Sequence, residues 1–375
     1  MTPGVSIVIP TWNGLDLLKR FLPSVIAAAG CYSEQAAAPT EIIVVDDGSA
    51  DGSIEWLVTE GFVDADSKGA SAFEAPRSVT VGSERSKSWE SATPGRDDRC
   101  RIHVDRRLIR SKINNGFGES CNRGFAAAKH RLVFLLNNDV EPAVDSIAPL
   151  TENFEEGSVF AAHCRVFDIE SGRECGTGRI GTFARGFLRV HRGYTVEGQI
   201  GQPSISSGDF YSMFASGGSS MFDRLKFIET GGFDSLLAPY YWEDVELSYR
   251  SWKRGYSIVY EPRSVARHRV SSTIRKLNQA EVRKIEHRNR LIYHWIHLHD
   301  PWMLLSHALW VLLLALSGPL RRKPDFILSC VAALRLLPDI RKRRREEKLA
   351  RIRSDREVLA IFRSLESRSD IVAQT

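Results

Sequence analysis

Three apolar segments of the chain each end in a short cluster of acidic or amide side chains. The clusters are Asp46-Asp47, Asn137-Asn138-Asp139 and Glu243-Asp244. Ligands of open α/β sheets bind beyond the carboxyl ends of the strands, so we expect these side chains to share one crevice. Carboxylates repel phosphate unless a cation intervenes, but they hold divalent metal ions and can take a proton. These groups suit the transfer of a sugar from a nucleoside diphosphate.

Strand and helix signals alternate around the first two clusters. Residues 5–9, 42–45 and 132–136 are short β-branched or leucine-rich runs that are typical of buried strands. Residues 15–29 and 51–59 have helical patterns. This alternation predicts a parallel, doubly wound α/β sheet, which would bring the strand ends to one edge.

The rest of the chain is predicted to extend this sheet and then to become helical. Residues 159–167 and 214–222 have strand character, and residues 245–254 a helical pattern. The Gly-rich residues 173–207 are expected to form a flexible loop over the site. The polar residues 64–100 are expected to form a surface insertion of little order.

We therefore expect two regions. Residues 1–275 would form the catalytic unit, a mixed sheet with a nucleotide-binding half and an acceptor-binding half. Residues 276–375 would form a helical, basic extension. The formal net charge is +5, and residues 321–375 contain 15 Lys/Arg and 8 Asp/Glu, so they carry +7 and the remaining residues −2. A basic tail can be a solvated helix or can bind an anionic membrane or nucleic acid. We expect the membrane and no nucleic acid.

Several classes of protein are disfavoured. The six cysteines show no C-x-x-C spacing, which argues against a zinc ribbon or a disulfide framework and fits a reducing compartment. No secretory signal pattern opens the sequence, so we expect a cytoplasmic catalytic part. The turn after the first predicted strand is Pro10-Thr11-Trp12-Asn13-Gly14, with neither G-x-G-x-x-G nor a Walker A sequence, which disfavours dinucleotide oxidoreduction and P-loop chemistry.

The motifs, in their order, resemble the family 2 inverting glycosyltransferases of the GT-A fold, and within them the branch with bacterial rhamnosyltransferases. The resemblance covers residues 5–273. It rests on Pro10-Thr11-Trp12-Asn13, Asp46-Asp47-Gly48-Ser49, Asn115-Gly116-Phe117-Gly118, Asn137-Asn138-Asp139, Gly231-Gly232-Phe233-Asp234, Trp242-Glu243-Asp244-Val245-Glu246 and Arg267-His268.

The resemblance implies a role for each of these positions. Asp244 would be the catalytic base, with Glu243 beside it to orient the acceptor or Asp244. Asp139 and His268 would hold a divalent metal ion, Mg²⁺ or Mn²⁺, between the two phosphates. Gly217, Gly218 and Trp242 would line the acceptor pocket. The nucleotide sugar would be bound by Pro10, Thr11, Trp12, Asn13, Asp46, Asp47, Asn115, Gly116, Asn122 and Asn138.

The chain departs from the family's pattern at the metal motif. Many GT-A enzymes have Asp-x-Asp there, and Asn137 replaces the first aspartate. One carboxylate and one imidazole remain as protein ligands, so phosphate oxygens and water would complete an oxygen-rich site. Each motif also has a plain structural alternative: Asp46-Asp47 could be a turn, Asn13 a helix cap and Asp244 an N-cap.

The implied reaction moves a sugar, with rhamnose as the branch-level choice, from a UDP- or dTDP-linked donor to a hydroxyl. The acceptor would be a saccharide or a lipid-linked saccharide of cell-surface polysaccharide synthesis. A nucleotide-sugar-binding scaffold without turnover is the alternative, but Glu243-Asp244 disfavours it. A nucleotidyltransferase would need a triphosphate-binding loop, and residues 10–14 contain no Arg or Lys.

Two apolar runs near the C-terminus, residues 302–316 and 326–337, fall short of the roughly 20 residues that span a bilayer. Basic clusters follow each of them, at residues 321–323 and 341–345. We expect helices that lie in or dip into the cytoplasmic face of the membrane, as in a peripheral or monotopic protein. The alternative is a helical hairpin packed on the catalytic unit or on a second subunit of a homodimer.

Overall fold

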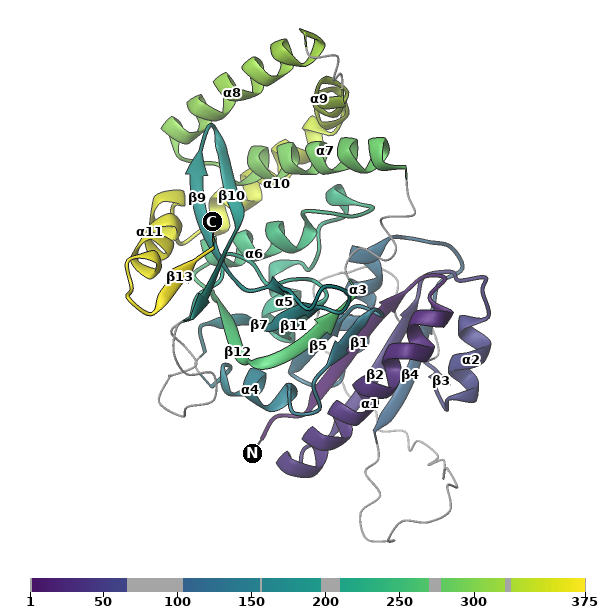
Figure 1. The fold of residues 1–375 in the computed structure, drawn as a ribbon. Helices are drawn as coiled ribbons and strands as arrows, with labels where there is room; N and C mark the ends of the chain where they lie inside the picture. Colours follow the sequence, from purple (N-terminus) through teal and green to yellow (C-terminus); the bar gives the residue numbers. More distant parts are fainter. Residues whose placement is uncertain are drawn as a thin grey trace, which may run out of the picture.

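The computed structural model describes residues 2–65, 104–155, 157–196, 210–269, 278–320 and 325–374 (Figure 1). Apart from Asp64 and Ala65, the insertion predicted at residues 64–100 lies outside the described residues. The strands of the main sheet are β1 (Val5–Thr11), β2 (Thr40–Asp46), β3 (Val63–Asp64), β4 (Asp105–Arg110), β5 (Leu132–Leu136), β6 (Val140–Pro142), β7 (Val159–Asp168), β8 (Glu174–Gly176), β11 (Ser219–Asp223) and β12 (Ser257–His268).

These ten strands have the order β3-β4-β2-β1-β5-β11-β7-β12-β6, with β8 paired to β7. The five strands from β3 to β5 are parallel, and β11 runs antiparallel to both β5 and β7. The register places Thr11 opposite Asp46, and Ser219, at the start of β11, opposite Leu136. The ends of β1, β2 and β5 therefore meet the start of β11 at one edge.

Helices cover both faces of this sheet (Figure 1). Those of the sheet region are α1 (Leu15–Ala36), α2 (Ser53–Thr59), α3 (Phe117–Ala127), α4 (Ile147–Glu152), α5 (Arg224–Thr230) and α6 (Glu243–Lys253). Alternate residues of a strand point to opposite faces, and the core divides accordingly. Val8 and Ile43 pack in one cluster with side chains of α3, α5 and α6, whereas Ile7 and Ile42 pack in the other with α1, α2 and α4. The prediction of a doubly wound mixed sheet is confirmed.

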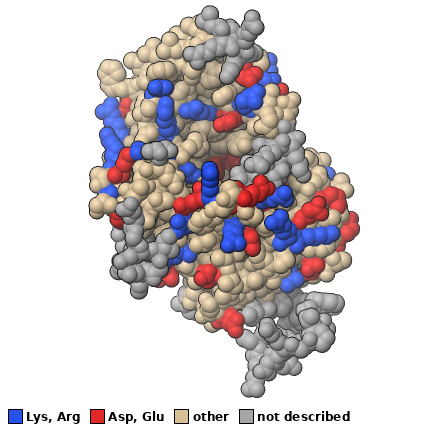
Figure 2. All heavy atoms as spheres, viewed as in Figure 1, with Lys and Arg blue, Asp and Glu red and all other residues tan. Residues whose placement is uncertain are grey.

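The C-terminal part is helical, as predicted. Its helices are α7 (Gln279–His297), α8 (Pro301–Leu320), α9 (Asp325–Arg335), α10 (Leu337–Ala350) and α11 (Asp355–Glu366). In Figure 1 α7, α8 and α9 lie above the sheet, with α8 at the top, and α11 lies to one side near β13; in Figure 2 the described atoms at that top are mostly tan, the colour of uncharged residues. None of the helices that the structure describes is both long and apolar enough to cross a membrane.

The prediction of a flexible loop at residues 173–207 is wrong for residues 173–196, the part that the structure describes. Residues 174–176 form β8, and a second sheet contains β9 (Gly178–Ala184), β10 (Phe187–Val196) and the C-terminal β13 (Ile371–Ala373). Two of its glycines serve close packing. A Cβ at Gly178 would collide with the Tyr194 ring, and one at Gly181 with the Met213 sulfur. The glycines that suggested a loop are therefore places where large side chains approach the backbone. Residues 197–209 lie outside the described residues.

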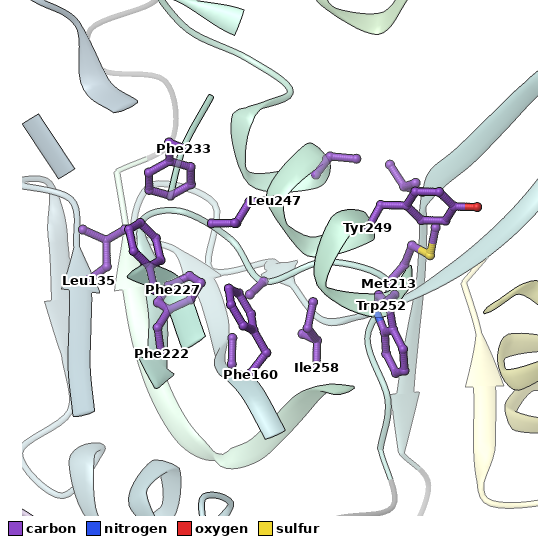
Figure 3. Packing of buried hydrophobic residues seen from close by; sticks show 14 of the residues in the cluster. Leu135, Phe160, Met213, Phe222, Phe227, Phe233, Leu247, Tyr249, Trp252 and Ile258 are labelled. Atoms are coloured by element: carbon purple, nitrogen blue, oxygen red, sulfur yellow. The ribbon is translucent and has the colours of Figure 1, made fainter. Parts of the chain in front are cut away.

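Aromatic side chains fill the core between the sheet and α6. Figure 3 shows Phe222, Phe227 and Phe160 grouped near Leu247 of α6. Phe125 and Phe227 stack with their ring centroids 3.6 Å apart, and Phe222 meets both rings edge-on. Stacked and edge-on pairs add to the stabilisation that burial of such rings provides. This packing fixes the side of α6 that faces the sheet.

The other side of α6 is fixed by the C-terminal helices. Asp355 is 1% exposed, and its carboxylate accepts hydrogen bonds from Lys253 Nζ (2.7 Å), Tyr249 Oη (2.8 Å) and the backbone N–H groups of His299 and Asp300 (2.7 and 2.8 Å). The division at residue 275 stays a prediction about folding units, but this buried ion pair crosses it.

We expect Asp355→Ala to lower the free energy of unfolding by about 3–5 kcal/mol, because it leaves the buried Lys253 ammonium without its counter-charge. Asp339→Ala on the exposed side of α10 is the matched control, and it should cost no more than about 1 kcal/mol. Urea denaturation of the full chain measures both. Equal, small losses in the two variants would show that the ion pair does not anchor α6.

Candidate active site

A cavity of about 490 Å³ lies where β1, β2, β5 and the first turn of α6 meet. A larger cavity of about 600 Å³ lies at the amino ends of β1 and β5, away from the acidic strand ends. The smaller cavity is lined by twelve of the predicted site residues: Pro10, Thr11, Trp12, Asp47, Gly116, Asn138, Asp139, Gly217, Gly218, Glu243, Asp244 and His268. Five others do not line it: Asn13, Asp46, Asn115, Asn122 and Trp242.

The two adjacent aspartates after β2 have different surroundings. Asp47 lines the cavity, and its carboxylate accepts hydrogen bonds from the backbone N–H groups of Asn115 (3.0 Å) and Gly116 (2.8 Å). Asp46 is fully buried, and its Oδ1 accepts from the N–H groups of Gly48 and Ser49 at 3.1 and 3.0 Å. Asp47 therefore fixes the loop that forms one wall of the cavity, whereas Asp46 shapes the turn behind it.

The end of β1 and the turn after it are cross-linked to both neighbouring strand ends. Asn13 Oδ1 accepts from Ala50 N at 2.8 Å, which ties this turn to the one after β2. Thr11 Oγ1 accepts from Asn138 Nδ2, also at 2.8 Å, which ties it to the end of β5. The ring of Trp12 stays 42% exposed beside these contacts. The resulting surface is rigid, with one aromatic face open to the cavity.

Two predicted binding residues lie in the protein interior. The Asn122 amide both donates to Phe233 O and accepts from Phe233 N, each at 2.9 Å, so it joins α3 to the segment before α6. Trp242 is 7% exposed, with its ring centroid 5.4 Å from that of Tyr293. Tyr240 and Tyr241 line the cavity in its place. The structure thus places aromatic rings at this wall, but from the residues before Trp242.

The predicted metal ligands meet at the cavity. His268 Nε2 lies 3.0 Å from Asp139 Oδ1, because β12 pairs with β6 in a register that sets His268 opposite Val140. Among the described residues there is no group of three or more His, Cys, Asp or Glu arranged to hold a metal ion. The pair alone is a partial donor set that faces open space. It fits an ion whose other ligands are oxygens of a bound diphosphate and water.

Glu243 and Asp244 are adjacent carboxyl groups with different partners. Asp244 accepts from Gly217 N at 3.3 Å and from Val245 N at 2.8 Å, at the positive end of the α6 dipole. Glu243 Oε2 is buried and has no hydrogen-bond partner among the described residues. Burial raises the pKa of Asp244 above its usual value. Burial and the neighbouring Asp244 raise the pKa of Glu243 to about 8.

At neutral pH, one of these two adjacent carboxyl groups carries a proton, and that group is Glu243. Two backbone N–H groups stabilise the negative charge of Asp244, whereas no described group stabilises a charge on Glu243 Oε2. The first turn of α6 then presents one carboxylate, Asp244, and one neutral acid, Glu243. A carboxylate whose pKa lies above the usual aspartate value, at a cavity wall, is a candidate general base.

Glu246, the third acid of this motif, is committed elsewhere. Burial alone would raise its pKa, but the Arg250 guanidinium and a hydrogen bond from His297 lower it to about 2. Its two oxygens lie 2.6 Å from Arg250 Nη2 and 2.7 Å from His297 Nε2. Glu246 is 1% exposed and does not line the cavity, so it does not compete with Asp244 as a base.

Sequence reasoning missed Asn289, which holds the segment before α6. Tyr241 and Trp242 both have positive φ angles, 71° and 75°, which non-Gly residues rarely adopt and which cost energy. Asn289 Nδ2 donates to the carbonyl oxygens of Tyr240 and Tyr241 at 3.0 and 2.9 Å, and to that of Leu237. The available signal was helical spacing, which puts this amide on one face with the buried Ile292 and Tyr293.

The comparisons with known proteins bear on this site and fold. The family model described as "Glycosyl transferase family 2" matches residues 6–60 and 97–216. No curated protein matches the sequence. Among solved structures, GalNAc-T7 with UDP, GalNAc and Mn²⁺ is similar with a TM-score of 0.53 and 16% identity, over 90% of this chain and 58% of that one. The chain thus spans less than two thirds of GalNAc-T7.

A second similar structure is the mannosyltransferase PcManGT from Pyrobaculum calidifontis in complex with GDP-Man and Mn²⁺, with a TM-score of 0.48 and 15% identity. The likeness extends over 98% of this chain and 89% of PcManGT. At 16% identity the likeness to GalNAc-T7 speaks for the fold, and the family match adds the sequence motifs around β1, β2 and β5. The fold is thus that of the GT-A glycosyltransferases, and just under half of the chain matches the family 2 model.

Proposed function

We propose that this protein transfers a sugar from a nucleoside diphosphate sugar to an acceptor hydroxyl, with inversion at the anomeric carbon. One observation carries the proposal: a single cavity contains Asp47, the Asp139–His268 pair and the Asp244 carboxylate. Asp47 and Asp139 follow the ends of β2 and β5, and His268 ends β12. Asp244 comes from the first turn of α6, so donor and base can act in one space.

The donor's nucleoside would lie against the strand ends. The exposed Trp12 ring offers a face for a base, and Thr11 and Asp47 offer polar atoms for the base edge and the ribose. Asp139 and His268 would hold Mg²⁺ or Mn²⁺, which would neutralise charge on the departing diphosphate. GalNAc-T7 was solved with UDP and Mn²⁺, which supports a donor and an ion of this kind.

The chemical step would be one displacement. The acceptor oxygen forms a bond to the anomeric carbon while the bond from that carbon to the diphosphate oxygen breaks, and the nucleoside diphosphate leaves with the electron pair. Asp244 takes the acceptor's proton as the oxygen attacks, because a neutral hydroxyl is a poor nucleophile. Glu243, which carries a proton at neutral pH, can donate a hydrogen bond to the acceptor and does not compete for its proton.

The identities of donor and acceptor are narrower proposals that rest on the sequence motifs. We propose rhamnose from a dTDP- or UDP-linked donor as the first sugar to test. For the acceptor we propose a saccharide or lipid-linked saccharide of cell-surface polysaccharide synthesis. Tyr240 and Tyr241 at the cavity wall offer aromatic faces against which a sugar ring could stack.

Asp244→Asn keeps the shape of the side chain but removes its ability to take a proton. We expect turnover to fall by roughly 10²–10⁴-fold, with little change in donor binding. The matched variant is Glu243→Gln, which imitates the neutral acid and should stay within about tenfold of wild type. Steady-state kinetics with a panel of nucleotide sugars measures both. The opposite ranking of the two variants would move the base to Glu243.

The acid limb of the pH–rate profile should reflect the burial of Asp244. A base works only when ionised, so activity is present above its pKa and lost below it. Burial raises the pKa of Asp244. We therefore expect kcat/KM to begin to fall, as the pH is lowered, at a higher pH than an ordinary aspartate would give. An acid limb at or below the pKa of a free aspartate, about 3.9, would contradict this assignment.

Asp139→Asn tests the metal site through binding rather than turnover. We expect the variant to bind UDP or dTDP at least about tenfold more weakly than wild type in Mn²⁺, because it lacks the ligand charge. In EDTA the two proteins should bind equally. Asp145→Asn, an exposed aspartate six residues farther along, is the matched control and should behave as wild type. Calorimetric titrations in which Mn²⁺ improves binding to Asp139→Asn as much as to wild type would remove this role.

A further inference from the structure

Helix α8 exposes a row of large apolar side chains. Trp302, Leu305, Leu309, Leu312, Leu313 and Leu316 are each between 52% and 71% exposed. Spacings of three and four residues put these side chains on one face of the helix. At 1.5 Å per residue, the row is about 21 Å long. Between Pro301 and Leu320 there is no charged residue. A continuous apolar surface of this kind marks a binding face.

The opposite face of α8 is attached to the body of the protein. His307 is 3% exposed, and its Nδ1 lies 2.7 Å from Gly186 O at the turn between β9 and β10. A Cβ added to Gly186 would lie 2.8 Å from both Ser306 O and the Trp310 Cβ, so the helix sits directly on this turn. The contacts of this opposite face therefore hold α8 in place with its apolar row facing outward.

Helix α9, which contacts α8, exposes further apolar side chains, and exposed cations follow these along the chain. Leu328, Val331 and Leu334 are 43–52% exposed at a spacing of three residues. Arg335 follows directly, and Arg341 and Lys342 are exposed on α10. None of these three cations has an ion-pair partner among the described residues. In Figure 2 the described atoms near the top of the molecule, where Figure 1 places α8, mostly belong to uncharged residues.

We propose that the α8–α9 surface docks the protein on an anionic lipid membrane, with the apolar row in the acyl boundary and the exposed cations at the headgroups. The apolar row is long, formed by single helices and edged by a tryptophan, which suits the interface of a bilayer. Arg335 at the end of α9, with the exposed cations that follow on α10, matches the negative charge of anionic lipids. The proposal goes beyond the transfer reaction and does not depend on it.

Flotation of the full chain with vesicles tests this docking. Vesicles of equal parts phosphatidylglycerol and phosphatidylcholine should carry the protein upward, and vesicles of phosphatidylcholine alone should carry much less. The double variant Leu309→Asp/Leu313→Asp should lose binding by at least about tenfold, since burial of even one leucine is worth about that factor. Protein that stays at the bottom with the anionic vesicles would overturn the proposal.

A matched double variant controls for the loss of exposed apolar side chains in general. Val58→Asp/Leu225→Asp changes residues that are 54% and 62% exposed on α2 and α5, compared with 53% and 54% for Leu309 and Leu313. It should float as wild type does, and equal losses in the two double variants would overturn the proposal. Arg341→Gln/Lys342→Gln should weaken flotation only with anionic vesicles.

Sedimentation velocity separates a membrane from a second copy of the chain. Under the proposal, Leu309→Asp/Leu313→Asp changes vesicle binding and leaves the oligomeric state in solution as it is. A dimer that the same variant dissociates, together with absent flotation of wild type, would assign this surface to a second copy. Unchanged circular dichroism and unfolding midpoint in all variants confirm that differences in flotation come from the surface.

Discussion

Buried charges on α6 have to be neutralised before its first turn can face the cavity. Glu246, Arg250 and Lys253 are each at most 2% exposed, so they depend on partners inside the protein. Glu246 pairs with Arg250 on the same helix and with His297 of α7, while Lys253 pairs with Asp355 of α11. Two of these partners come from the C-terminal helices. The orientation of Asp244 thus depends on residues more than fifty positions away in the sequence.

This dependence makes the C-terminal region part of the site in physical terms. Asn289 of α7 holds the strained Tyr240–Trp242 segment through the carbonyl groups of Tyr240 and Tyr241, and that segment leads directly into Glu243 and Asp244. Two consecutive residues with positive φ persist only where the surrounding structure fixes them. Helices α7 and α11 therefore support the first turn of α6, while α8 and α9 each leave a set of apolar side chains exposed.

The acidic and amide clusters predicted that Asp47, Asn138 and Asp139 would share a crevice, because parallel strands end at a common edge, and the family resemblance added most of the other lining residues. To decide which of two adjacent residues points into the cavity, the course of the backbone has to be known. Of the adjacent Asp46 and Asp47 only the second lines the cavity, since successive residues leave a strand in opposite directions. Trp242 turned inward because its φ of 75° reverses the chain just before α6. No local pattern encodes that turn, and Asn289, which holds it, lies 48 residues from Tyr241.

The sequence predicted the order of strands and helices better than it predicted the side-chain contacts between them. Apolar periodicity located the parallel strands, but the glycines of residues 173–207 suggested a loop where they in fact let Tyr194 and Met213 pack against β9. Sequence separates these cases poorly, because the reason for a glycine lies in a side chain far along the chain. In the same way, the two apolar C-terminal runs indicated burial or membrane contact, and the structure shows that many of their large side chains are exposed, whereas others, such as Val311 and Phe326, pack on the core.

The central claim is a single displacement in which Asp244, at the α6 end of the cavity, receives the acceptor's proton. The anomeric configuration of the product tests it most directly, because one displacement inverts the configuration and a route through a glycosyl-enzyme intermediate retains it. Proton NMR of the sugar product at early times, with the donor that supports turnover, should show a glycosidic bond of configuration opposite to that of the donor. A product that retains the donor's configuration would contradict this account.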